Sequence, residues 1–244
     1  MEYINLMSPQ LYYAVMLITE PQKARRIFLA EELENWFMDL FDDEFEDILD
    51  GTFKDNQEVY IDRIVDKYLE ITNVEITNTD EYTKSVVDKA YKTATEIQET
   101  TYKNIVTLPI SKGIDEISTE DEIKEFNTAS LILGGLAIGS VILANGNVKR
   151  WLGQERANLI ALNEANWKWN NEEFFEAKEN KKTKTWHTAL DERVRFDHMA
   201  VEGVTVGIDE HFIVGGYPML YPLDTSLGAD VSQIANCRCS VSYQ

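Results

Sequence analysis

The residues best suited to chemistry lie in the last quarter of the chain. Both cysteines, Cys237 and Cys239, fall in the tetrapeptide NCRC, and one of the three histidines, His198, ends the stretch KTWHTALDERVRFDH. In an extended segment, residues two apart point to the same face, so the two sulfurs can act together. Two thiolates make half of a zinc site, and His198 would supply a third ligand.

The fourth position of such a site has several candidates. His187, His211, Asp191 and a water molecule all stay open at this point. The spacing is not that of a zinc finger, and the competing interpretation is two small buried thiols beside a histidine that hydrogen-bonds a carbonyl. The sequence favours this second interpretation, requires no cofactor, and keeps a structural zinc ion as the alternative.

Asp191, Arg193 and Arg195 alternate along a short extended stretch or turn, so all three can lie on one side of it. An aspartate flanked by arginines predicts a bidentate ion pair that fixes a loop. The functional alternative is an anion or phosphate site. Because residues 181–184 read KKTK, that alternative extends to a modest contact with DNA or RNA.

No catalytic template accompanies these groups. The sequence lacks G-x-S-x-G, H-E-x-x-H, a Walker loop and the glycine pattern of dinucleotide-binding folds. An enzyme would need a metal-activated water held by Asp191, His198 and the cysteines. We therefore predict no enzymatic activity and no catalytic residue, with a metal-dependent enzyme acting on nucleic acid or a nucleotide as an alternative.

The elements that must position these groups begin with helices. Apolar residues spaced three and four apart from Phe28 to Leu49 predict a long amphipathic helix that stops at Gly51. Trp36, Phe37 and Phe41 are the expected anchors if this stripe meets a partner, and an intramolecular core is the alternative. The opposite face is expected to be solvated and acidic, with Asp39, Asp42, Asp43, Glu44, Glu46, Asp47 and Asp50.

Further helical patterns cover residues 56–71 and 79–105, and another follows residue 148. In this last pattern Leu159, Leu162 and Trp169 are expected to share one apolar stripe. Beyond Asp191, the runs VTVGI, FIVGG and RCSVSY predict short strands between loops.

These patterns predict an α+β fold. Long amphipathic helices make up its N-terminal part, and a small mixed α/β module with short strands ends the chain. The predicted domains are an acidic helical region, 1–148, which packs on itself or faces a partner, and a C-terminal module, 149–244.

The charge distribution supports the same division. The formal net charge is −20. Residues 181–244 hold six basic and eight acidic side chains, a net of −2, and residues 1–180 hold the remaining net of −18. Such a charge argues against coating nucleic acid, which needs clustered lysine and arginine, whereas it suits a basic partner surface. The start of the chain lacks the basic region of a signal peptide, so synthesis in the cytosol is expected.

Residues 129–145, ASLILGGLAIGSVILAN, carry no charge. The run is shorter than the roughly 20 residues that span a bilayer, and its glycines weaken a lone helix. A buried core helix or a bent helical pair is the favoured interpretation. Membrane contact by an ejected protein is the alternative.

The ordered set of motifs from about residue 150 to the end resembles the phage Mu F-like head morphogenesis family. Any one motif is weak, but their order and spacing together are specific. The set comprises Arg156, Glu164, Asn170, Lys184, Trp186, Asp191, Arg193, Arg195, His198, Gly203, Pro222, Asp224, Asn236, Cys237, Arg238 and Cys239. The chain departs from the family at Asn163, where members tend to carry threonine or serine, and we expect that change to affect only local capping.

The resemblance implies a structural protein of the phage virion: a minor capsid protein made in the host cytoplasm and present in few copies. Members of the family are associated with the portal vertex inside the head, and some are thought to leave it with the DNA. Portal protein and other capsid components are the implied partners, with weak contact to packaged DNA. Some members carry a toxin domain after this module, and none is expected here because the sequence ends five residues after Cys239. The resemblance then implies a structural cluster, which consists of Lys184, Trp186, Asp191, Arg193, Arg195, His198, Asn236 and Arg238.

Overall fold

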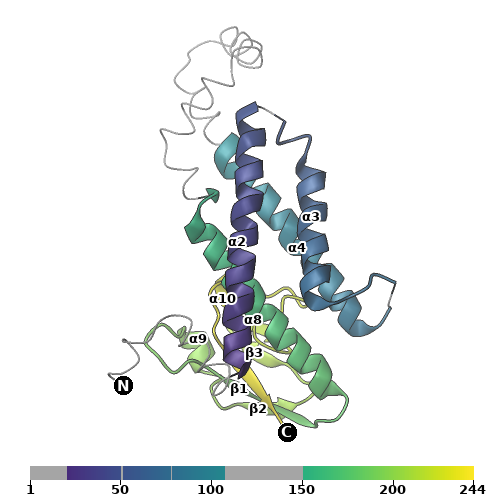
Figure 1. Cartoon of the computed structure of the whole chain (residues 1–244). Coiled ribbons are helices and arrows are strands. Elements are labelled where there is room, and N and C mark those ends of the chain that lie inside the picture. Colours follow the sequence, from purple (N-terminus) through teal and green to yellow (C-terminus); the bar gives the residue numbers. More distant parts are fainter. Residues whose placement is uncertain (1–20, 51, 78, 108–150) are drawn as a thin grey trace. The chain divides into compact units, whose positions relative to one another are not determined.

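The computed structural model describes residues 21–50, 52–77, 79–107 and 151–244 (Figure 1). The α+β class predicted from the sequence is confirmed, with helices in the N-terminal part and short antiparallel strands near the C-terminus. The chain divides into two compact units. The helical unit comprises residues 35–157, and the mixed unit comprises residues 1–34 and 158–244.

The helical unit is built from the second half of α2 (Pro21–Asp50), α3 (Gln57–Thr72), α4 (Glu81–Thr101) and the π-helical turn η2 (Tyr102–Thr107). All three predicted helices are present. The Asp80 side chain caps α4 by accepting a hydrogen bond from the Thr83 N–H at 2.8 Å. Asn73 ends α3 in the left-handed conformation that asparagine tolerates, with φ 52°. Local sequence signals therefore set these helix ends.

The core of the helical unit is aromatic and aliphatic. Phe37 and Phe41 are fully buried in it, as the intramolecular interpretation of the α2 stripe requires, whereas Trp36 is half-buried and meets Phe37 edge-on. Among the described residues, the other fully buried apolar side chains of this unit, at 0% exposure, are Leu40, Ile64, Val86, Ala90, Ala94 and Ala157.

Among the described side chains of the acidic face of α2, Glu44 departs from the sequence prediction. Glu44 is 0% exposed, so placing it on the solvated face was wrong. Residues three and four apart share a helix face, and Glu44 follows Leu40 and Phe41 on the buried side. Its carboxylate accepts a hydrogen bond from the amide of Gln98, another fully buried polar residue. A specific partner thus brings this acid into the core.

The mixed unit contains α8 (Gln154–Lys178), which runs into it from residue 158, and two small sheets. The three-stranded antiparallel sheet has the order β2-β1-β5, from Thr205–Gly207, Thr183–His187 and Ser240–Tyr243. The second sheet is the hairpin of β3 (Phe212–Val214) and β4 (Tyr217–Met219). The described part of the unit also contains the first half of α2 and two four-residue helices, α9 (Phe196–Met199) and α10 (Val231–Ile234).

Of the five strands in the described part of the chain, three lie within the runs that the sequence predicted. The central strand β1 was not predicted as a strand, although its residues alternate between half-buried and buried positions. Its pairing fixes the register of the end of the chain, because Trp186 lies opposite Val241 and Lys184 lies opposite Tyr243. The sheet therefore ties the C-terminal segment to the strand that begins the motif series.

Helix α8 buries a different face from the one predicted. Leu159 and Leu162 are 46% and 42% exposed, so the leucine stripe is not the core face. The helix instead buries small and polar side chains, which allow other backbone segments to approach closely. These are Ala157, Ala161, Glu164, Ala165, Asn170, Asn171 and Ala177, together with Trp167 and Phe174.

Two sequence predictions concern residues outside the described part of the chain. These are the apolar segment 129–145 and the proposed domain boundary at 148/149. Within the described ranges, no helix combines the length and apolar character needed to cross a membrane.

Candidate metal centre

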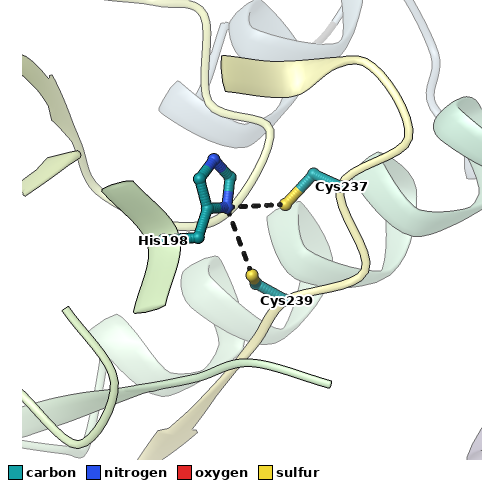
Figure 2. Close-up of side chains that lie close together, drawn as sticks. All are labelled: His198, Cys237 and Cys239. Atoms are coloured by element: carbon teal, nitrogen blue, oxygen red, sulfur yellow. Dashed lines mark hydrogen bonds between the residues drawn. The ribbon is translucent and has the colours of Figure 1, made fainter. Parts of the chain in front are cut away.

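The imidazole and the two thiols meet in the mixed unit. His198 Nδ1 lies 3.3 Å from the Cys239 sulfur and 3.6 Å from the Cys237 sulfur (Figure 2). The side chains are buried, with exposures of 2% for His198, 2% for Cys237 and 4% for Cys239. Their potential ligand atoms all lie within 4.8 Å of one another. Groups separated by 39 and 41 residues along the chain thus form one cluster.

The two sulfurs are electrostatically coupled. A hydrogen bond from the Cys239 thiol and the nearby imidazole hold the pKa of Cys237 well below its ordinary value. The same sulfur–sulfur hydrogen bond and burial raise the pKa of Cys239. The pair therefore loses its first proton easily and its second with difficulty. A cation that attracts both thiolates would remove this penalty.

Asparagines on one face of α8 hold the segment that carries the cysteines. The Asn163 side chain accepts a hydrogen bond from the Asn236 N–H at 2.8 Å. Asn166 and Asn170 donate to the carbonyls of Cys237 and Cys239 at 3.4 and 3.5 Å. These three asparagines, which we call the asparagine ladder, form hydrogen bonds with backbone groups of residues 236–239. At these residues the loop pairs with no strand. Asn163 thus lies inside the helix and binds the NCRC segment, so the expected role limited to capping was wrong.

Asp191 forms its main ion pair with Arg238, the residue between the two cysteines. Two Arg238 nitrogens donate to the two Asp191 carboxylate oxygens, each at 2.6 Å. Arg193 approaches Asp191 only at 3.7 Å, and Arg195 instead donates to the Ala235 carbonyl. The Arg238 hydrogen bonds lower the pKa of Asp191 to about 2. Both side chains of the pair are about a third exposed, so water screens it.

Strand β1 directs Lys184 and Trp186 into the interior. Trp186 is fully buried and meets the His198 ring edge-on, with ring centroids 6.0 Å apart. Lys184 is also fully buried, with its Nζ 4.9 Å from the Phe174 ring centroid and 5.5 Å from that of Phe212. Burial lowers the pKa of Lys184 to about 8. Lys184 therefore packs against aromatic rings and is not available to the nucleic-acid contact considered for residues 181–184.

The other residues considered as a fourth ligand lie elsewhere. The His187 ring lies 2.8 Å from the Ser242 hydroxyl and 3.6 Å from the Glu202 carboxylate. His211 is exposed, and the Asp191 carboxylate is hydrogen-bonded to Arg238. Within the described part of the chain, the potential metal-binding group consists of His198, Cys237 and Cys239. This buried group could bind a metal ion.

Comparison with known families identifies the motif series. A model of the family described as phage Mu protein F like protein matches residues 100–242, more than half of the chain. The chain belongs to the phage Mu F-like family. No curated protein and no solved structure matches it. The match begins earlier than the motif series itself, so the Mu F-like region includes the end of α4 and η2.

Mu F-like proteins are head morphogenesis and minor capsid proteins of phages, and they are generally structural. Three late motif residues of this Mu F-like chain, His198, Cys237 and Cys239, form the cluster, and Trp186 of β1 meets the His198 ring edge-on. Sequence reasoning missed two participants, the side chains of Asn163 and Asn166. A signal was present, because asparagine is unfavourable inside helices and residues 163, 166 and 170 lie on one face.

Arg156, the first residue of the Mu F-like motif series, belongs to the helical unit and not to the mixed unit. Arg156, in the first turn of α8, donates to the Ile97 carbonyl at 3.1 Å and to the Thr101 hydroxyl at 2.7 Å. It also donates to the Trp151 carbonyl, and its guanidinium lies 5.2 Å from the ring centroid of Phe41. Burial lowers the pKa of Arg156 to about 10. Arg156 thus fastens the start of α8 to the last turn of α4.

Proposed function

We propose that this chain is a low-copy minor head protein that sits at the portal vertex inside the phage head. It assists head assembly there, with the portal protein and neighbouring capsid components as partners. Membership of the Mu F-like family carries this proposal, because that family consists of head morphogenesis and minor capsid proteins. In this proposal the acidic region 1–148 contacts itself or the portal, and residues 149–244 form a C-terminal module that lies almost wholly within the Mu F-like match of 100–242.

Composition of purified particles tests this role. Quantitative mass spectrometry of DNA-filled heads should find the chain at a few copies per particle, far below the major capsid protein. Asymmetric reconstruction of the same heads should place its density next to the portal. Absence from heads, or an abundance equal to that of the major capsid protein, would contradict the proposal. A comparison of filled and emptied heads then decides whether the chain leaves with the DNA.

The charge suggests how the chain behaves toward packaged DNA. Residues 1–180 carry a net charge of −18, which repels the genome and would keep the portal entrance clear. We expect weak binding to duplex DNA at low salt, where the repulsion between the acidic surface and the DNA is screened least. At 0.1 M salt this repulsion already falls off over a screening length of about 10 Å. Gel-shift titrations at low and high salt measure this, and tight binding unaffected by salt would rule out the repulsive role.

The metal-capable cluster supports a structural role better than an enzymatic one. A metal-dependent enzyme acting on nucleic acid would need an ion open to its substrate. Here all three candidate ligands are at most 4% exposed. We therefore propose that the cluster takes a structural zinc ion and that the chain has no catalytic role.

A further inference from the structure

The loop that carries the cysteines lies between two short elements, α10 and β5, each of four residues. His198 lies on another four-residue element, α9. Helices of this length do not hold their conformation alone, because they have too few internal hydrogen bonds. We propose that His198, Cys237 and Cys239 bind one zinc ion that fastens residues 236–239 to α9, with a water molecule as the fourth ligand. This inference rests on the structural role proposed above for the same cluster.

The two nitrogen–sulfur separations fit one tetrahedral ion. With Zn–N bonds of about 2.1 Å and Zn–S bonds of about 2.3 Å, tetrahedral angles place nitrogen and sulfur about 3.6 Å apart. The two distances from His198 Nδ1 to the sulfurs are 3.3 and 3.6 Å. Figure 2 shows the same ring nitrogen facing both sulfurs, as a shared ion requires. The ligand atoms therefore need little movement to close around zinc.

Charge balance also favours a cation at this position. Two thiolates and a neutral imidazole carry two negative charges, which a divalent ion cancels. Burying a charge without a compensating charge is costly, and a divalent ion would supply that compensation here. Thiolate and imidazole ligands suit zinc, whereas magnesium and calcium prefer oxygen ligands. The chemistry of the donor set thus selects a thiophilic ion.

The surroundings of the cluster hold its two cysteines in position. The asparagine ladder fixes the backbone at Asn236, Cys237 and Cys239 from the α8 side. Arg238, between the two cysteines, points outward to its bidentate partner Asp191. Hydrogen bonds to the groups around a metal site orient its ligands and increase metal affinity. The sulfurs are therefore directed toward His198 by contacts that do not involve the metal.

Three protein ligands leave one tetrahedral position. Within the described residues, no further histidine, cysteine, aspartate or glutamate joins the group. A zinc ion with three protein ligands takes water as its fourth. In this chain the water would be enclosed, because the surrounding side chains are buried. Burial separates this arrangement from a catalytic zinc site, whose water must meet a substrate.

Metal analysis of the purified full-length chain tests the proposal. We expect about one zinc ion per chain. Cobalt substitution should give the intense sulfur-to-metal charge-transfer band of a tetrahedral thiolate site. A strong chelator should lower the Tm and increase hydrogen exchange in residues 196–199 and 236–243. Cys237→Ser, Cys239→Ser and His198→Gln should each lose most of the zinc, whereas His211→Gln, at an exposed histidine outside the cluster, should keep it.

If the cysteine variants fail to fold, measurements on the wild-type chain still decide the test. A folded wild-type chain without zinc, whose Tm and hydrogen exchange do not respond to chelator or added zinc, overturns the proposal. Iron or another metal at full occupancy overturns the assignment of zinc. These outcomes are independent of the role in the head: a zinc-free chain found at the portal removes only this inference, whereas a zinc-bound chain absent from heads removes only the proposed function.

Discussion

Replacing Arg156 with methionine is expected to destabilise the helical unit by about 2–3 kcal/mol, because hydrogen bonds to a charged group contribute about 1.5–3 kcal/mol and the part-buried acceptors of Arg156 lose theirs. The substitution keeps much of the side-chain volume and removes the guanidinium. The carbonyls of Ile97 and Trp151 then lose a donor, and so do the hydroxyls of Thr100 and Thr101. Urea unfolding followed by hydrogen exchange in α3 and α4 measures the loss where it should occur.

Arg63→Met provides the matched control. Arg63 belongs to the same unit and pairs with Asp43 at 2.7 Å, but the two side chains are 39% and 55% exposed. An exposed pair of this kind contributes about 1 kcal/mol or less. Equal losses for the two variants would mean that Arg156 does not stabilise the junction between α4 and α8.

The sequence predicted the helices well because their signals are local. The three-and-four spacing of α2, the Asp80 cap of α4 and the asparagine that ends α3 each act within a few residues. Strands β2, β3 and β5 also lie in β-prone runs. Strand β1 was missed because its inward residues include Lys184, and a lysine at a buried position breaks the expected alternation of apolar and polar residues.

The candidate site could be predicted only in part. His198, Cys237 and Cys239 were suggested as a group by their residue types, and their proximity then required the fold. The sequence could not show which arginine forms the main ion pair with Asp191. Arg238 and Arg193 are equally plausible partners until the loop from α10 to β5 is placed. The α8 prediction was wrong for a related reason: leucine is usually a core residue, yet this helix uses its asparagine side for tertiary hydrogen bonds.

Glu44 in the helical unit is another residue whose burial the sequence did not predict. The pH dependence of stability that this burial causes can be measured directly. Burial raises the pKa of Glu44 to about 7, against the hydrogen bond from Gln98 and the attraction of Arg156 and Arg63, while Asp47 raises it further. Because the folded pKa lies above the unfolded value of 4.5, the folded state binds more protons between these values. The contribution of protonated Glu44 to stability is therefore complete below pH 4.5 and is lost as the pH rises through 7.

Glu44→Gln should remove this pH dependence and stabilise the helical unit by about 3 kcal/mol at pH 8, since each pKa unit corresponds to about 1.4 kcal/mol. At pH 4 the two proteins should be nearly equal. Glutamine keeps the acceptor for Gln98 and, like the protonated acid, adds a donor near the buried Gln98 Oε1, which has no partner within the described residues. Glu46→Gln, at an exposed position of the same helix, is the control and should leave the pH profile unchanged. If Glu44→Gln is instead less stable than the parent at pH 8, the ionised carboxylate is held by Arg156, and the pair stabilises the core as an ion pair rather than as an acid beside an amide.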